Sequence, residues 1–430
     1  MPAVNMSADP VWLEADSAVA VSSRLASDFS IAEEDGKEMI LRRYAYLDSD
    51  DVDSLIACGV IETMRIDGRK MMHRKTVRNV GLLHRADGDA WRGRGSGASE
   101  ARMAYADTVI GWSKGLSTGG CKSVLYRFII DVPYDDAIAG DSLRVWMPFP
   151  RLTARQPDVR LVSAFPSEYV LSPDSASIHK SIYFYAPAPE VGDTAHFEYV
   201  CEYTVCGEYH SPESIIENIK DYDRESPLYR MYTSEDFPHI VRLDSLAYSI
   251  VGDERNPYRQ SELVYEYISS HYPWAGAREY STIPCITDYV VDCGHGDCGQ
   301  VALLYISLMR TLGIPARWES GWMLHPGEKN LHDWAEVYFE GVGWIPVDVS
   351  FGRYVGSERK DIRNFYSTGI DPYRLAANAG ICGALYPPKH FIRSETVDFQ
   401  LGEVECSRGN LFYPVWNQHL QILEIKTVEL

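Results

Sequence analysis

The sequence has no hydrophobic run long enough to cross a bilayer and no run of basic residues. Its longest nearly unbroken apolar stretch, from Val301 to Met309, is far shorter than the roughly 20 residues of a transmembrane helix. Positive charge is scarce, because 41 Lys+Arg stand against 61 Asp+Glu and the formal net charge is −20. Proteins that bind nucleic acid need clustered Lys and Arg to displace counterions. We therefore expect no membrane span and no nucleic-acid partner.

Cysteine is also scarce, and nine in 430 residues is too few for a disulfide scaffold. The odd number leaves at least one thiol unpaired within the chain. Cys201 and Cys206 lie five apart on an expected strand and so face opposite sides, and we predict half-buried thiols. Cys285, Cys293 and His295 lack the spacing of a zinc knuckle, so no metal or other cofactor is expected. Cys293 remains open as a partner of Cys285, a resolving thiol or a core cysteine.

The length and the 45% hydrophobic share predict two or three globular domains. Residues 1–13 lack the features of a secretory leader, so we expect a cytoplasmic location by default, or export if a leader has been removed. We divide the chain into an N-terminal mixed region of unclear fold (1–120), an antiparallel β-sandwich-like domain (121–210) and a catalytic domain with a C-terminal extension (211–430). The predicted fold class is α+β.

Local patterns predict the main elements. The acidic stretch from Asp48 to Asp53 is interpreted as a capped helix start, and Asp67-Gly68 as the turn of a hairpin. The glycine-rich tract 87–98 is interpreted as a flexible connection. Alternating apolar residues predict strands at 124–132, 143–147, 159–162, 181–185 and 196–205, and helical patterns follow at 212–222, 239–251 and 257–272.

The segment from Gly294 to Pro315 carries a helix with a cysteine at its start. Apolar residues recur at helical spacing from Val301 onward, and Asp297 with Gln300 forms a capping-box pattern. Cys298 is therefore placed at the first helical position. Since the helix dipole and the free amides of the first turn favour an anion there, we expect a thiolate nucleophile with a backbone amide that can bind an oxyanion.

A candidate base and its partner follow on two expected strands, 330–339 and 343–350, joined by a Gly-containing turn. If Tyr338 pairs with Trp344, His332 and Asp348 share one face as diagonal neighbours within reach of each other. A shift of the register by one residue would place the two side chains on opposite faces. The pattern therefore makes a specific structural prediction.

These motifs together resemble the transglutaminase-like superfamily of papain-like cysteine enzymes, bacterial type. The resemblance rests on Gly296-Asp297-Cys298-Gly299, on His332-Asp333-Trp334-Ala335-Glu336 and on Gly343-Trp344-Ile345-Pro346-Val347-Asp348, and it extends to the block 365–412. It implies a helix that carries the cysteine packed on an antiparallel sheet. It also implies Cys298 as nucleophile, His332 as general base and acid, and Asp348 as the residue that orients the imidazole.

Family members commonly add an oxyanion donor upstream of the nucleophile, and here Tyr280, Trp274 and Tyr289 qualify, of which we favour Tyr280. Four other histidines are expected on the surface or in loops, and four tryptophans in the core: His295, His325, His390 and His419, and Trp318, Trp322, Trp334 and Trp344.

The predicted function is a cysteine-dependent hydrolase of an amide or peptide bond through a thioester acyl-enzyme. Its substrate would be a peptide, a protein or a cell-wall-like amide. Two alternatives stay open, namely a protein-glutamine acyltransferase that crosslinks proteins, and a non-catalytic binding protein with a vestigial triad.

Overall fold

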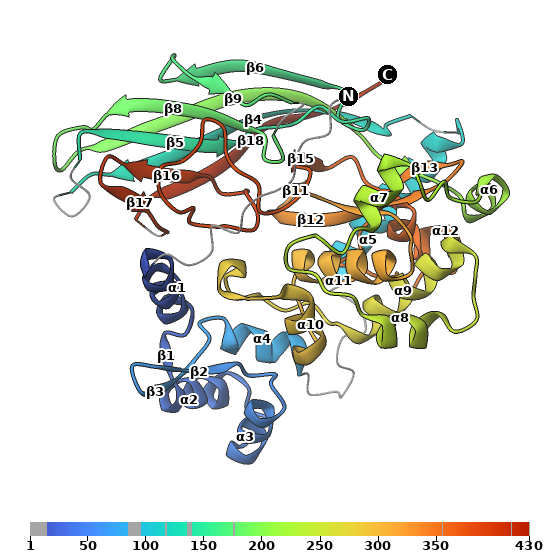
Figure 1. Cartoon of the computed structure of the whole chain (residues 1–430), viewed down its shortest axis with the longest axis horizontal. Coiled ribbons are helices and arrows are strands. Elements are labelled where there is room, and N and C mark those ends of the chain that lie inside the picture. The colour runs from blue at the N-terminus through green and yellow to red at the C-terminus, as the bar shows by residue number, and fades with distance from the viewer. Residues whose placement is uncertain are drawn as a thin grey trace.

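The computed structural model describes residues 15–84, 96–116, 118–135, 140–174, 177–354, 356–413 and 415–429. Two stacked antiparallel sheets lie along one side of the molecule, a helical layer lies beneath them, and the N-terminal helices form a separate lobe (Figure 1). The mixture of helices and antiparallel sheets is the predicted α+β class. The glycine-rich connection falls outside the described residues up to position 95.

The N-terminal lobe has its own small apolar core around Ile40, Val52 and Val80. The predicted hairpin is present, and Asp67 and Gly68 in its turn have φ values of 48° and 79°. Asp48 caps a helix through a capping box with Asp51, as the acidic pattern indicated. The lobe contains α1 (Ala15–Asp28), β1 (Ile31–Ala32), α2 (Glu33–Arg43), α3 (Ser49–Ala57), β2 (Thr63–Ile66), β3 (Arg69–Met72) and α4 (Thr76–Leu83), and α5 (Ser96–Ser113) follows it.

The two stacked sheets enclose a single apolar core that includes Phe128, Val145 and Tyr199. One sheet has the strand order β18-β4-β9-β6 and the other β17-β16-β5-β8-β7. All five strands predicted in this region form, and the short β7 is additional. The strands are β4 (Cys121–Pro133), β5 (Ser142–Pro148), β6 (Asp158–Phe165), β7 (Val170–Leu171), β8 (Ser181–Pro187), β9 (Thr194–Cys206), β16 (Glu403–Cys406), β17 (Gly409–Leu411) and β18 (Asn417–Val428).

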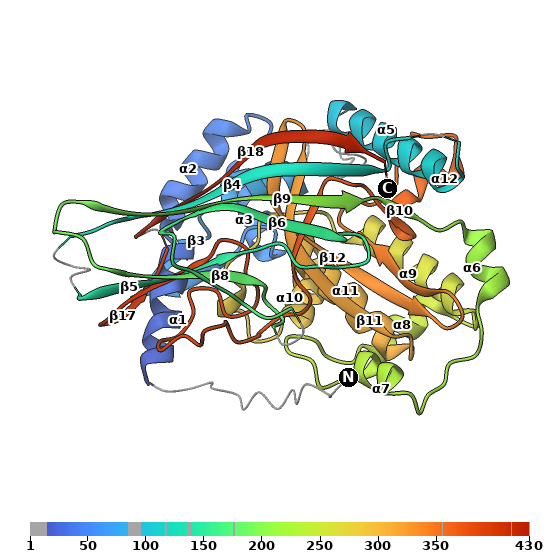
Figure 2. The same ribbon diagram turned by 90° about the horizontal axis from the view of Figure 1, so that it is seen from above.

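The last strands of the chain complete these sheets. β18 pairs with β4 over nearly its whole length (Figure 2). β16 pairs with β5. Sequence analysis assigned this segment to an extension of the catalytic part, because a local pattern shows that a strand forms but not which edge it joins. The described chain thus leaves the two sheets after β9 and returns to them at its end.

A disulfide joins Cys121 and Cys206, which lie directly opposite each other on β4 and β9. The prediction that Cys206 is a free, half-buried thiol was therefore wrong, because its partner lies 85 residues away in sequence and faces it only after the strands pair. Cys201 is a free, buried thiol. Cys285 and Cys293 are both free, so they do not form a pair.

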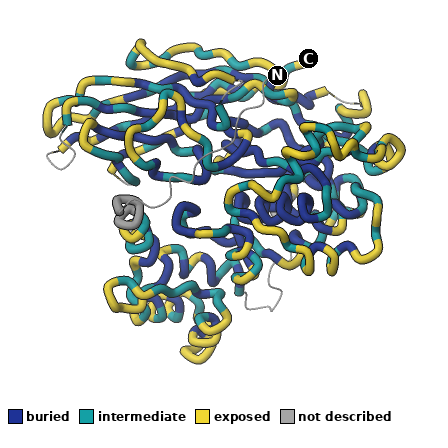
Figure 3. The backbone as a smooth tube through the Cα atoms, in the orientation of Figure 1, coloured by how far each residue is buried: buried dark blue, intermediate teal, exposed yellow. Residues whose placement is uncertain are grey.

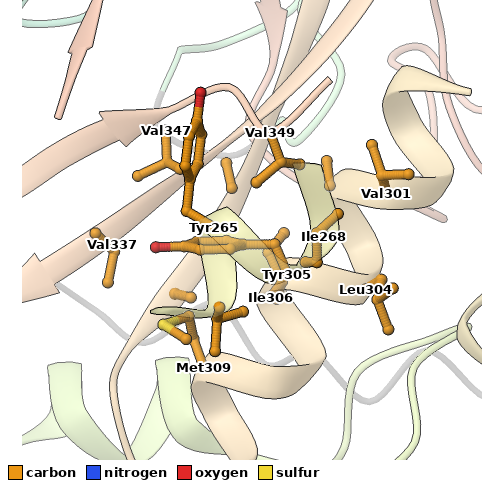
Figure 4. Close-up of a cluster of buried hydrophobic side chains, with 14 of the residues drawn as sticks. Tyr265, Ile268, Val301, Leu304, Tyr305, Ile306, Met309, Val337, Val347 and Val349 are labelled. Carbon is orange, nitrogen blue, oxygen red and sulfur yellow. The ribbon is translucent and has the colours of Figure 1, made fainter. Parts of the chain in front are cut away.

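The part of the chain that contains Cys298 consists of helices packed on the four-stranded sheet β13-β12-β11-β15. Its centre is the helix α11, which is buried along its whole length and packs against Tyr265, Val337 and Val347 (Figures 3 and 4). The helices are α6 (Pro212–Asn218), α7 (Pro227–Thr233), α8 (Asp244–Val251), α9 (Pro257–His271), α10 (Ile286–Cys293), α11 (Cys298–Thr311) and α12 (Lys360–Arg363), with short 3-10 turns η1 (Tyr280–Thr282) and η2 (Phe365–Ser367). The strands are β10 (Glu208–Tyr209), β11 (Ala316–His325), β12 (Glu328–Phe339), β13 (Gly343–Val347), β14 (Gly369–Ile370) and β15 (Arg374–Asn378).

Within the described part of the chain, no helix combines the length and the apolar character that a membrane crossing needs.

Candidate active site

Cys298 is the first residue of α11, as the sequence predicts. The Asp297 side chain accepts a hydrogen bond from the Gln300 amide at 3.2 Å, and Gln300 Oε1 accepts one from the Asp297 amide at 3.1 Å. This capping box fixes the start of the helix, so the cysteine occupies the first turn with its free amides. The Cys298 side chain is 8% exposed.

A cavity of about 290 Å³ reaches Cys298 from the surface. Three separate parts of the chain form its walls. They are residues 74–78 of the N-terminal lobe, the segment 274–280 before α10, and the C-terminal segment 395–413, in addition to the strand β12. The N-terminal lobe, whose role the sequence left open, therefore contributes directly to the surroundings of the candidate nucleophile.

The thiol contacts a carboxyl group that sequence analysis did not single out. Cys298 Sγ donates to Asp333 Oδ2 at 3.1 Å, and Gln400 Nε2 donates to the other oxygen of Asp333 at 2.8 Å. Gly299 allows this close approach, because a Cβ there would lie 2.8 Å from Asp333 Oδ2. A signal was present in the sequence, because Asp333 is a charged residue on the same strand face as the apolar Ala335, and this face is directed at α11.

The thiol is protonated in this arrangement. Burial raises the pKa of Cys298 well above its ordinary value, and the neighbouring Asp333 and Asp297 raise it further. Burial also raises the pKa of Asp333 far above that of a free carboxyl, aided by Asp398 and Asp297. The expectation of a resting thiolate was therefore wrong, because the helix terminus predicts only its own favourable dipole and not the carboxyl groups that the fold adds around it.

His332 and Asp348 meet as the predicted register requires. Tyr338 pairs with Trp344, and His332 Nε2 lies 2.6 Å from Asp348 Oδ2. Ser350 Oγ donates to the second oxygen of Asp348 at 2.7 Å. Since Nε2 is engaged by the carboxylate, Nδ1 is the nitrogen through which the imidazole could exchange a proton with a nucleophile.

A buried arginine stabilises this carboxylate. Arg374 Nη1 lies 3.0 Å from Asp348 Oδ2, and Arg374 Nη2 donates to Asp371 Oδ2 at 2.8 Å. Burial alone would raise the pKa of Asp348, but His332 and Arg374 outweigh it and hold that pKa below its usual value. Arg374 lies in the C-terminal block of the resemblance, but its sequence position gives no indication that it reaches Asp348.

The four side chains discussed so far form two pairs, which lie on opposite faces of the strand β12. Consecutive residues of a strand point to opposite sides, so His332 and Asp333 face away from each other on β12. The structure brings Cys298 together with Asp333 on the face toward α11, and His332 together with Asp348 on the other face. The structure thus joins His332 to Asp348 as predicted, whereas Cys298 donates its hydrogen bond to Asp333.

Tyr280 lies beside the nucleophile and lines the same cavity. Its hydroxyl donates to Asp297, the residue that caps α11. Burial, together with the carboxyls of Asp297 and Asp333, raises the pKa of Tyr280 well above its ordinary value, so the phenol keeps its proton. Trp274 also lines the cavity, whereas Tyr289 donates to Glu62 at 2.6 Å in the N-terminal lobe.

The prediction for His325 was wrong, because it is buried at the end of β11, whereas His295 lies in the loop between α10 and α11 as expected, although it is buried there. Trp318, Trp322 and Trp334 are buried as expected. Across the described ranges, no group of three or more His, Cys, Asp or Glu side chains is arranged to hold a metal ion.

Comparison with known proteins identifies the core. Residues 244–349 match the family model of the Transglutaminase-like superfamily, a range that contains Cys298, His332 and Asp348. The uncharacterised protein YebA of Bacillus subtilis is 26% identical over 155 residues, which are 30% of this chain and 21% of YebA. An uncharacterised protein of Haemophilus influenzae is 27% identical over 126 residues, 23% of this chain and 33% of that protein. The chain thus matches a third or less of the length of these relatives.

Two solved structures match the chain at low identity and with TM-scores below 0.5. A Cytophaga hutchinsonii protein, provisionally named a cysteine protease, is 16% identical with a TM-score of 0.46, over 72% of this chain and 91% of that one. The periplasmic domain of TgpA from Pseudomonas aeruginosa is 15% identical with a TM-score of 0.25, over 58% of this chain and 91% of that domain.

Proposed function

We propose that this chain, which carries a transglutaminase-like core, hydrolyses an amide or peptide bond through a thioester on Cys298. The observation that carries the proposal is the placement of Cys298 at the start of α11 and at the wall of a cavity, with α11 packed on the sheet in which β12 carries His332 and β13 ends next to Asp348. The family match over 244–349 supports the same assignment.

The thiol must lose its proton before it can attack. In the proposed mechanism His332 accepts that proton through Nδ1, while Asp348 holds the imidazole through Nε2 and stabilises the imidazolium. Because Cys298 and His332 lie on opposite faces of β12 in the structure, this step requires the Cys298 side chain to leave Asp333 and the two groups to move into contact. Arg374 keeps Asp348 ionised, so the pair is ready to accept charge.

The thiolate then forms a bond to the carbonyl carbon of the substrate, and an electron pair moves to the carbonyl oxygen. The amide of Cys298 and the protonated Tyr280 hydroxyl are the proposed donors to this oxyanion. Collapse breaks the carbon–nitrogen bond, and the amine leaves with the proton of His332. Water then attacks the thioester, gives a proton to His332 and releases the acid, and the thiol regains its proton.

The test is activity profiling of the full chain against a library of peptide and acyl amides. Cys298→Ala should abolish turnover and thioester formation, a loss of at least about 10⁴-fold, whereas Cys293→Ala, which removes a free thiol five residues earlier, should leave both unchanged. Mass spectrometry of the quenched enzyme detects the acyl-enzyme.

The products discriminate the open alternatives. Acid as the product in the presence of a primary amine supports hydrolysis, and amide as the main product makes the chain an acyltransferase. A chain that forms no acyl-enzyme with any member of the library, and whose Cys298→Ala variant behaves like the wild type, would be a binding protein.

A further inference from the structure

The cavity in front of Cys298 has a wall that the proposed mechanism does not use. Arg74, Lys75 and Arg78 of the N-terminal lobe line it, beside the segment that carries Trp274 and Tyr280. Three cations in one short segment are notable in a chain with a net charge of −20. Their presence at this wall is therefore not a consequence of the average composition.

This wall is held in place by specific contacts with the catalytic core. Asn79 exchanges two hydrogen bonds with Gly276, at 3.0 Å and 2.9 Å, and both groups are buried. Lys75 Nζ donates to the Ala277 carbonyl at 2.5 Å. Asp28 Oδ2 accepts from the Glu279 amide at 2.6 Å. These contacts fix the position of α4 relative to the segment 276–279.

Two of the three cations form hydrogen bonds within the protein, whereas the third lies on an aromatic ring. Arg74 donates to Asp28 at 2.8 Å, and Lys75 is bonded to the core as described. The Arg78 guanidinium lies over the Trp274 ring, 5.2 Å from its centroid, and forms no ion pair with any residue that the structure describes. A guanidinium held on an aromatic ring keeps its planar fork of donors available for a carboxylate.

The carboxyl groups in the cavity do not cancel this charge. Burial is the largest cause that raises the pKa of each of them, and that of Glu395 reaches about 8. At neutral pH they therefore carry less negative charge than their number suggests, whereas the arginines stay protonated. The carboxyl groups concerned are Glu279, Asp297, Asp333, Glu395 and Asp398.

We propose that the cavity in front of Cys298 binds a carboxylate of the substrate through Arg78 on Trp274, so that the chain acts on acidic peptides or other carboxylate-bearing amides. The substrate class rests on the proposed function, whereas the anion site itself does not. The N-terminal lobe is then a specificity element, and α4 supplies the residue that selects the substrate.

The anion site is tested first by a probe that needs no turnover. Iodoacetate and iodoacetamide alkylate the same thiol but differ by one negative charge. We define a normalised ratio as the alkylation rate with iodoacetate divided by the rate with iodoacetamide on Cys298, divided in turn by the same quotient on N-acetylcysteine. Measured by peptide mapping at low salt, this ratio should be about five in the wild type. Arg78→Glu should lower it to one or below, and Arg78→Lys should retain most of it.

The matched control is Arg69→Glu, which reverses an exposed charge on β3 outside the cavity and should leave the ratio unchanged. A normalised ratio of one in the wild type, or a ratio that Arg78→Glu does not alter, overturns the anion site. Circular dichroism and denaturant unfolding verify that each variant is folded, and Arg78→Lys keeps the test valid if the reversal destabilises the lobe.

The second arm addresses the substrate class with peptide amides that differ only by Glu or Gln near the scissile bond. A higher kcat/KM for the Glu peptide, lost in Arg78→Glu, supports the proposal. Equal values overturn the substrate class. If neither peptide is turned over but the alkylation ratio persists, the proposed function fails and the anion site stands. Protection of Cys298 by inorganic phosphate but not by succinate would overturn the assignment to carboxylates.

Discussion

Buried carboxyl groups on the two faces of the strand β12 have pKa values shifted in opposite directions. On one face, Asp348 and Asp371 have pKa values below the usual range, because His332 and Arg374 outweigh burial at Asp348, and Arg374 and His325 outweigh it at Asp371. On the other face, burial raises the pKa values of Asp333 and Asp398, and the carboxyls of Asp398 and Asp297 raise that of Asp333 further. All of these carboxyl groups are buried, so the charged groups around them decide the difference in sign.

The difference separates two tasks that the proposed chemistry requires. The face with His332 is an ionised, hydrogen-bonded pair that holds the imidazole in one orientation. The face with Cys298 keeps the nucleophile protonated beside Asp333 until it is used. Three predictions test this contrast.

The largest effect is expected from removing the buried cation. Arg374→Met leaves Asp348 and Asp371 buried without their shared partner, which should lower the free energy of unfolding by about 3–5 kcal/mol. Denaturant unfolding measures it. Arg230→Met, which removes an exposed arginine, should change stability by less than about 0.5 kcal/mol. A loss below about 1 kcal/mol for Arg374→Met would contradict the account of the ionised face.

The next effect concerns the reactivity of the thiol. In the wild type, ionised Cys298 and ionised Asp333 would lie 3.1 Å apart, which raises the pKa of the thiol. Asp333→Asn removes the carboxyl that opposes ionisation of the thiol once it is itself ionised, so at pH values where Asp333 is ionised the thiol pKa should fall and alkylation by iodoacetamide should be about tenfold faster, equal to about 1.4 kcal/mol.

The control for this variant is Asp50→Asn, which alters an exposed carboxyl of the N-terminal lobe. Alkylation that becomes slower in a folded Asp333→Asn protein would mean that Asp333 accepts the thiol proton, and the roles assigned to the two faces would then be reversed.

The third effect is a pH dependence of stability from Glu395 at the cavity wall. Its pKa is about 8 in the folded protein, above the ordinary value of 4.5, so its contribution is fully present below pH 4.5 and is lost as the pH rises toward 8. Because glutamine does not ionise, Glu395→Gln should lose less stability than the wild type between pH 5 and pH 8, by at most about 3.5 kcal/mol. Unfolding curves at the two pH values provide the measurement, and parallel losses would refute the raised pKa.

The local elements of the site could be predicted because their signals are short in sequence. The capping box at Asp297 and Gln300 places Cys298 at the start of α11, and the turn after β12 sets the register that joins His332 to Asp348. Both depend on residues within a few positions of each other. The same is true of the Asp67-Gly68 hairpin and of the five predicted strands between residues 121 and 206.

The elements that were missed depend on contacts between distant segments. Cys206 forms a disulfide with Cys121, and Arg374 contacts Asp348, only once the sheets have assembled. The thiolate expectation failed for the same reason, because Asp398 and Gln400 approach Asp333 from the C-terminal segment.

The sequence by itself determined the helix that carries Cys298, the strand register that joins His332 to Asp348, and the resemblance to transglutaminase-like enzymes, since these follow from local periodicity, capping and turns. Only the tertiary structure decided the protonation of the site and the wall that the N-terminal lobe adds to the cavity. The physical reason is that burial and the charge of spatial neighbours set a pKa, and both are properties of the assembled fold.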